Sequence, residues 1–264
     1  PVDRDNPDAL KVLPEVRRLL FDGKNEEATQ LSAESMMGIP PRVRSYQSLG
    51  ELYLSSPESG AVSEYRRDLD LDTGIATTTY VVGGVAYTRE VFSSVPDQVI
   101  AIRIKSGTSG TVSFEAMLAR EKDASVRIIV PGRMTLHGRC GQSDQGRTYR
   151  GLPFEACVDI KAIGGTVTST DSSLVVTGAD EAVILVAGAT GYISQTDISA
   201  DPSRLNEVCL SKAVGKSWQE LRDAHIADHQ AMFRRMTLDL GTTKQSALPT
   251  DERLRAYADG AADP

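Results

Sequence analysis

The sequence predicts a mainly β protein: a large antiparallel two-sheet super-sandwich with N-terminal helices and a C-terminal helical linker. From about residue 45 to residue 200, apolar residues recur at every second position, the period of a half-buried strand. Glycines separate these runs at short intervals with no helical pattern between them, which is typical of an antiparallel sandwich or barrel. Two stacked sheets are expected because one open sheet seldom exceeds about 10 strands.

The first 37 residues are expected to be helical. Apolar residues recur there at three-to-four spacing after Asn6 and Pro7, which suit a helix cap and a first helical position. Pro14 falls inside this run and predicts a kink or a restart, because proline has no backbone N–H. A second helix is expected to begin at residues 25–27, where two glutamates favour the positive end of the helix dipole.

The clearest strand pair flanks Gly83 and Gly84. Alternating runs rich in β-branched residues occupy 75–81 and 85–91, and the Gly-Gly pair between them predicts a tight hairpin turn. Further strands are expected at 62–71, 97–105, 111–119, 125–130, 133–139, 154–162, 173–177 and 181–188.

The pattern returns to helix after Asp201 and Pro202. From Trp218 to Phe233, apolar and histidine side chains recur with a period of about 3.6 and form one stripe. Residues 238–241 interrupt the stripe, and a further helix is expected to begin near residue 250. The segment 203–264 has no closed core of its own. We therefore divide the chain into a β-sandwich domain, 1–202 (with helices in about 6–37), and a helical linker, 203–264.

Composition excludes several classes of function. The 29 Lys and Arg against 36 Asp and Glu give a net charge of −7, and no nucleic-acid partner is expected because such proteins need a basic face. The hydrophobic share of 40% is enough for a sizeable core. No apolar run approaches the roughly 18 residues of a membrane helix, so no membrane partner is expected. The charged start does not have the pattern of a signal peptide.

His225 and His229 form the nearest approach to a metal site. Their i, i+4 spacing places both imidazoles on one helical face, as in zinc enzymes. A catalytic zinc helix carries Glu directly after the first His, whereas this chain has Ile226, and no third ligand is evident. We therefore predict no metal site.

The carboxylates provide no clear catalytic pair. Asp68, Asp70 and Asp72 alternate on a predicted strand and are expected to point the same way, as a solvated face. Glu115 and Glu121 are the kind of residue a glycosidase pairs, but they have no identifiable acidic companion.

The three cysteines are interpreted as structural. Cys140, Cys157 and Cys209 lack the spacing of metal ligands, and free cysteine commonly behaves as a small buried hydrophobe. A disulfide between Cys140 and Cys157 stays open, because the sequence does not give the Cα separation that it requires.

Longer motifs run in order along nearly the whole chain. They are 46–52 (YQSLGEL), 65–73 (YRRDLDLDT), 87–94 (YTREVFSS), 96–99 (PDQV), 197–202 (DISADP), 225–229 (HIADH), 233–235 (FRR), 238–241 (LDLG) and 248–254 (LPTDERL). Together they resemble the N-terminal region of glycoside hydrolase family 95. This family comprises inverting α-L-fucosidases with a large β-sandwich ahead of an (α/α)6 barrel.

The resemblance implies that catalysis lies outside this chain. In the family, the general acid and the Asn/Asp set that activates water lie in the barrel, which is expected to begin where this chain ends. No catalytic residue, cofactor or metal is therefore assigned, and the chain alone is expected to be inactive. An opening strand segment is expected ahead of residue 1, and a secreted or periplasmic protein is implied by the resemblance alone.

The same resemblance implies the partners, namely the catalytic barrel of the same polypeptide and the carbohydrate substrate of the whole enzyme. Tyr46 and Gln47, on a loop that enters the sheet, are expected near the substrate or the sandwich–barrel interface. Two alternatives stay open. One is a stand-alone carbohydrate-binding or interaction module, and the other is the N-terminal domain of a family 65-type disaccharide phosphorylase, which shares the sandwich-plus-barrel plan.

Overall fold

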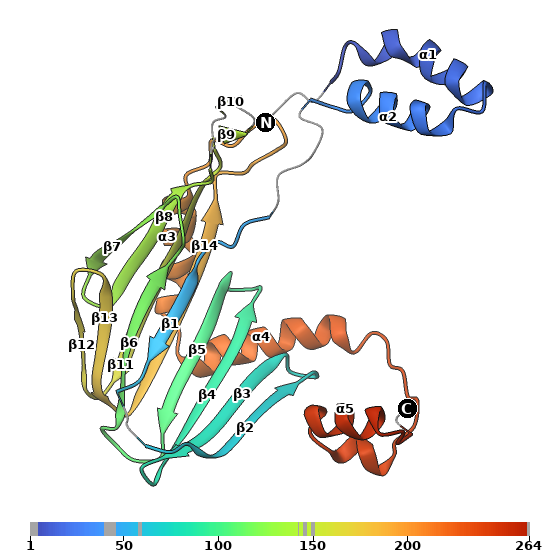
Figure 1. Cartoon of the computed structure of the whole chain (residues 1–264). Helices are drawn as coiled ribbons and strands as arrows, with labels where there is room; N and C mark the ends of the chain where they lie inside the picture. The colour runs from blue at the N-terminus through green and yellow to red at the C-terminus, as the bar shows by residue number, and fades with distance from the viewer. Residues whose placement is uncertain are drawn as a thin grey trace.

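Two antiparallel sheets form the centre of the protein (Figure 1). The computed structural model describes residues 5–39, 46–57, 60–141, 143–144, 147–148 and 151–262. In spatial order, the larger sheet contains β2 (Ser63–Asp70), β3 (Ile75–Val82), β4 (Val85–Ser94), β5 (Val99–Ser106), β14 (Glu181–Thr190), β11 (Pro153–Ile163), β8 (Arg133–Arg139) and β7 (Ala124–Val130). The smaller sheet contains β1 (Glu51–Ser55), β6 (Val112–Ala119), β13 (Ser173–Ala179) and β12 (Thr166–Ser169). The mainly β two-sheet prediction is confirmed.

Every strand range expected from the sequence corresponds to an observed strand, with ends that differ by a few residues. The short edge strands β1 and β12 were not predicted as separate strands, and neither were the two-residue strands β9 (Ser143–Asp144) and β10 (Arg147–Thr148), which pair with each other. The predicted hairpin is confirmed: Val82 pairs with Val85, and both intervening glycines have positive φ, +59° at Gly83 and +79° at Gly84. Positive φ at both central residues is the requirement of a type I′ turn.

The main core lies between the two sheets. Along β6, the side chains of Val112, Phe114, Ala116 and Leu118 are buried, whereas the intervening residues are half-buried. They pack against buried side chains from the facing strands β5, β8, β11 and β14 of the larger sheet. Leu174 of β13 belongs to the same cluster and is 0% exposed.

A second core lies on the opposite face of the larger sheet, where α3 (Pro202–Val214) and α4 (Trp218–Phe233) pack (Figure 1). Leu210, Trp218 and Leu221 from these helices contact a cluster that includes Phe92 and Leu185. Both helices begin at side-chain caps: Asp201 accepts bonds from the first turn of α3, and a capping box starts α4.

The cysteines are distributed between these two cores. Cys157 belongs to the helix-side cluster, whereas Cys140 packs against the cluster between the sheets. All three cysteines are free, so Cys140 and Cys157 do not form a disulfide. Burial raises the pKa of the Cys157 thiol to about 12, as expected for an unreactive structural cysteine.

The N-terminal helices α1 (Ala9–Phe21) and α2 (Asn25–Ser35) form a hairpin around Val16, Leu19 and Ala28. The predicted restart at Pro14 is wrong, because α1 runs through it. Proline deprives only the carbonyl of Leu10 of its donor, and Leu10 is 77% exposed, so water can reach the unpaired oxygen.

The prediction of a cap at Asn6 is confirmed in part. Asp8 is the N-cap of α1, but the Asn6 side-chain oxygen accepts the backbone N–H of Asp8 at 3.1 Å, as a capping side chain does. The Asn6 amide nitrogen also donates to the carbonyls of Ser35 and Met37 at 2.9 Å each. Asn6 thus connects the start of the helical hairpin to its end.

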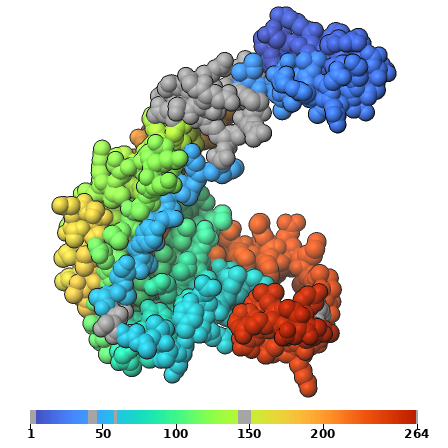
Figure 2. Space-filling model, viewed as in Figure 1, coloured from blue at the N-terminus to red at the C-terminus, as the bar shows by residue number. Residues whose placement is uncertain are grey.

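The C-terminal segment continues from α4 into a short 3-10 helix, η1 (Lys244–Ala247), and α5 (Thr250–Ala258). Neither η1 nor α5 contains a buried residue, and both project from the sandwich (Figure 2). Within the described ranges, no helix combines the length and apolar character needed to span a membrane.

The inter-sheet core can be tested with a leucine pair. Leu174→Ala should reduce the free energy of unfolding by about 2–5 kcal/mol, because it leaves a cavity between the sheets. Leu254→Ala on α5, where the leucine is 65% exposed, should cost less than about 1 kcal/mol. Chemical denaturation of both variants measures the difference, and equal costs would contradict this assignment of the core.

Candidate functional surface

The predicted site residues Tyr46 and Gln47 lie on an anchored, extended segment. Tyr46 is fully exposed, whereas the side-chain oxygen of Gln47 accepts a bond from Arg120 at 2.5 Å. Arg120 also donates to the carbonyl of Ser48 at 2.7 Å, and its guanidinium lies 4.2 Å from the centre of the Phe154 ring. Because Phe154 belongs to the inter-sheet core, Arg120 fixes this segment to the sandwich and leaves the Tyr46 ring in solvent.

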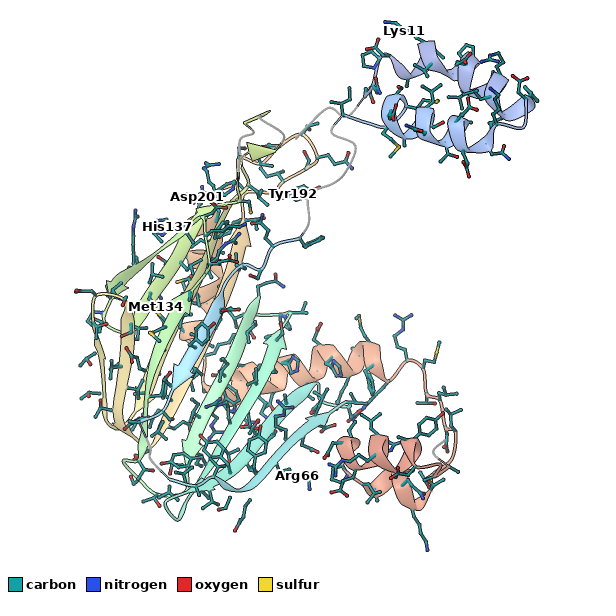
Figure 3. The ribbon with its side chains drawn as sticks, viewed as in Figure 1. Lys11, Arg66, Met134, His137, Tyr192 and Asp201 are labelled. Atoms are coloured by element: carbon teal, nitrogen blue, oxygen red, sulfur yellow. The ribbon has the colours of Figure 1, made fainter. Side chains whose placement is uncertain are left out.

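The segment crosses the end of β14. Leu49 lies over Gly188, where a Cβ atom would approach Leu49 Cδ2 to 2.6 Å, so a residue with a side chain would displace the segment. Tyr192 and Ile193 follow β14 at this end of the sandwich and are 56% and 57% exposed (Figure 3). The role of Tyr46 and Gln47 stays a prediction.

The histidine pair of α4 packs against the β2–β3 turn. His229 Nε2 lies 2.8 Å from the carbonyl oxygen of Leu71, and the His225 ring stacks on Phe92 at 4.6 Å between centroids. Gly74 approaches both imidazoles closely, since a Cβ atom there would lie 3.1 Å from His229 Nδ1 and 3.3 Å from His225 Nε2. The described residues contain no cluster of three or more His, Cys, Asp or Glu side chains that could hold a metal ion.

Asp72 makes the second link between this turn and α4. It accepts bonds from Gln230 at 2.9 Å and from Arg234 at 2.6 and 2.8 Å. The hydrogen bond from Arg234 lowers the pKa of the Asp72 carboxyl.

The predicted solvated face of three aspartates is wrong for Asp72. Strand β2 ends at Asp70, whose carboxylate accepts the backbone N–H of Asp72 at 2.9 Å and that of Thr73 at 3.4 Å. This side-chain turn ends the strand and directs Asp72 towards α4, whereas Asp68 stays on the strand beside Arg66.

The two candidate glutamates do not form a pair. Glu115 is half-buried on β6, in register with Ser55 and Val175, and Glu121 is exposed beyond the end of that strand. The strand from Glu115 to its end at Ala119 is about 13 Å long, and Glu121 lies beyond that end, so the two residues are farther apart than the carboxylates of a glycosidase site.

Burial changes along α4. Trp218, Leu221 and His225 are buried against the sandwich, but the end of the helix and the chain after it expose a series of apolar side chains. We call this series the C-terminal apolar surface; its members are Met232, Phe233, Met236, Leu238, Leu240, Leu254 and Tyr257. Large exposed apolar patches are typical of interaction sites, so this series is a candidate interaction surface.

Comparison with known proteins assigns the first three quarters of the chain. Residues 1–195 match the model of the glycosyl hydrolase family 65 N-terminal domain. The chain belongs to this family. Residues 217–264, which include α4 and the C-terminal apolar surface, match the glycosyl hydrolase family 95 catalytic domain. The resemblance to family 95 inferred from the sequence motifs is therefore confirmed.

The curated relatives are larger proteins. Alpha-L-fucosidase 2 of Arabidopsis thaliana is 31% identical over 286 residues, covering 97% of this chain and 34% of its own length. Probable alpha-fucosidase A of Aspergillus niger is 28% identical, covering 96% of this chain and 32% of its own length. The chain thus spans about a third of the length of the curated relatives it matches. A solved structure described as a kojibiose phosphorylase from the human microbiome aligns with a TM-score of 0.44 and 9% identity, covering 70% of this chain and 27% of that one.

The link between Asp72 and α4 predicts a pH-dependent stability. Because the folded-state pKa of Asp72 lies below its ordinary value of 3.8, its contribution is present above that pH and is lost as the pH falls through the folded pKa. Asp72→Asn should lower the melting temperature by about 1–3 °C at pH 7. The melting curves of the two proteins should converge only when the pH falls below the folded-state pKa, which is lower than 3.8.

The matched control is Asp68→Asn, which removes a carboxylate paired only with Arg66 of its own strand among the described residues. It should leave the exchange rates of the α4 amides unchanged, whereas Asp72→Asn should accelerate exchange near residues 230–234. Identical exchange in the two variants would contradict the proposed link.

Proposed function

We propose that the chain is the N-terminal, non-catalytic domain of an α-L-fucosidase-like glycoside hydrolase. The observation that carries this proposal is the alignment of 97% of the chain with only 34% of alpha-L-fucosidase 2. An alignment of this extent implies that the chain supplies one part of a longer polypeptide that acts on a carbohydrate. The chemistry would then reside in the remaining two thirds.

The proposed whole-enzyme reaction is the inverting hydrolysis of α-L-fucosides. In that mechanism a carboxylic acid protonates the leaving oxygen while a base-activated water attacks the opposite face of the sugar. The two groups stand about 6.5–9.5 Å apart to leave room for that water. The separation of Glu115 from Glu121 makes this glutamate pair unsuitable, so we assign no catalytic residue to this chain.

We further propose that the chain acts as a rigid support for the catalytic barrel of the same polypeptide. Three contacts fix α4 to the sandwich: the buried Trp218, the bond between His229 and Leu71, and the pair of Asp72 with Arg234. The C-terminal apolar surface would then pack against the barrel. In this proposal, residues 1–202 are the sandwich domain and residues 203–264 are the helical linker, of which residues 217–264 match the catalytic-domain model and would lead into the barrel.

A disaccharide phosphorylase is the second candidate. The observation in its favour is the match of residues 1–195 to the family 65 N-terminal domain. The two candidates differ in the molecule that attacks the glycosidic bond, which is water in one case and inorganic phosphate in the other. The phosphate dependence of turnover therefore separates them.

The fucosidase activity of the 264-residue chain can be compared with that of a longer protein. A protein that continues past residue 264 through a catalytic barrel should hydrolyse a chromogenic α-L-fucoside without added phosphate. The purified 264-residue chain should show no turnover above a blank. Turnover by the short chain would overturn its non-catalytic role, and a strict requirement for phosphate in the long protein would favour the phosphorylase.

The second prediction concerns Tyr46 and Gln47 within the longer protein. Replacing both by alanine should change kcat/KM or the melting temperature, because the exposed ring and the bond to Arg120 would no longer support the interface. Tyr65→Ala is the matched control, since it removes another exposed tyrosine ring. Tyr65 is 59% exposed and lies on β2, an edge strand of the larger sheet. If the double variant behaves like this control, the two residues have no role at the interface.

A further inference from the structure

A cleft opens where α3 stops covering the larger sheet. Helix α3 packs on β14 and β11, and the two strands beyond them, β8 and β7, continue the sheet to its edge. The cleft has a volume of about 290 Å³ and is lined by residues from β7, β8, β11 and the first two turns of α3. This volume is at the lower end of ligand pockets, about 300–1,000 Å³, and it suits one small ring.

Strand register brings the polar side chains of the cleft together. Thr135 of β8 is directly opposite Arg127 on one side and Cys157 on the other. Two residues along the strand, and therefore on the same face, His137 is opposite Glu155. Directly opposed residues have Cβ atoms about 4.5–5.5 Å apart, so these side chains can contact one small molecule together.

Glu155 is held in place before any ligand arrives. It is 8% exposed, and its two carboxylate oxygens accept bonds from Ser203 at 2.6 Å and from Asn206 at 3.2 Å. A carboxylate oxygen has two lone pairs, so each retains capacity to accept a hydroxyl proton. Glu155 therefore provides a preorganised acceptor in the wall of the cleft.

Three other lining side chains have no such local partners. Arg127, Thr135 and His137 make no side-chain hydrogen bond or ion pair with another described residue, although Thr135 is only 7% exposed. Arg127 offers guanidinium donors, and the Thr135 hydroxyl and the His137 imidazole can each donate or accept. The cleft thus combines donors and acceptors that face the same small volume.

The charges of the cleft disfavour an ionic ligand. Arg133 is already shared between Asp159 at 2.8 Å and Glu207 at 2.9 Å. The remaining charges are the cation of Arg127 and the anion of Glu155. An anion would meet the Glu155 carboxylate and a cation would meet Arg127, whereas a neutral polyol can donate to one and accept from the other.

We infer that this cleft binds the ring of one neutral monosaccharide. Adjacent hydroxyls of the sugar donate to Glu155 and accept from Arg127. The Thr135 hydroxyl makes a further hydrogen bond to the sugar, and Ile129 offers it an apolar contact. The site lies on the sandwich itself, and the inference does not depend on the reaction that the longer protein catalyses. Failure of the fucosidase proposal would therefore leave it intact.

The test is an amide-resolved NMR titration of the 264-residue chain with L-fucose and D-glucose, with sodium sulfate in parallel. At least one of the two sugars should cause saturable shifts in β7, β8, β11 and the start of α3. Arg127→Ala should weaken that binding about tenfold, the usual effect of losing a hydrogen bond to a charged group. Thr135→Val preserves the side-chain shape and should weaken it about threefold, as expected for a neutral hydrogen bond.

Arg67→Ala is the matched control, because Arg67 is an exposed arginine on β2, the other edge strand of the same sheet. It should leave binding within twofold of the unaltered chain, and unchanged amide shifts outside the cleft will show that each variant is folded. Saturable shifts with sulfate alone, shifts confined to another surface, no saturable shift with either sugar, or equal affinities of the Arg127 and Arg67 variants would each overturn the inference.

Discussion

Burial of both faces of the larger sheet is the constraint on which the rest of the structure depends. Ala182 and Ile184 of β14 pack towards the smaller sheet, whereas Leu185 and Ala187 pack towards α3 and α4. A strand buried on both sides cannot alternate apolar with polar residues, which explains the continuous apolar run of β14. Removing either covering layer would expose half of these side chains to water. The helices that follow the sandwich are therefore an integral layer of its core.

The same layer fixes the direction of α4. Helix α4 is held at its start by Trp218 and Leu221 and near its end by the β2–β3 turn. Two separated attachments fix the direction of a helix, whereas one would leave it free to pivot. Met232 and Phe233, at the end of α4 beside the second attachment, are consequently presented at a defined position, with little conformational entropy left to lose if another surface covers them.

Features that arise from neighbouring residues were predictable from the sequence, and features that arise from distant contacts were not. The Gly83-Gly84 hairpin follows from local turn chemistry, and the strand and helix periods follow from one buried face in each element. Asp72 was misassigned because it bonds to α4, far along the chain, and the bonds of Asn6 to the end of α2 were not predicted for the same reason. The cleft at α3 gave no sequence signal, since its lining comes from three strands and a helix spread over residues 127–207. Only the register between strands brings those side chains together.

The cleft and the C-terminal apolar surface share one structural origin. Glu155 joins β11 to α3 through Ser203 and Asn206, and this contact helps the buried Leu210 to fix where α3 crosses the sheet. If α3 lay one strand closer to the edge, it would cover β8 and fill the cleft. If it lay farther away, Glu155 would lose the bonds from Ser203 and Asn206. The observed position of α3 leaves the cleft open and at the same time directs the chain into α4. A single buried carboxylate thus contributes both to the wall of the proposed sugar site and to the position of α3, which leads into α4.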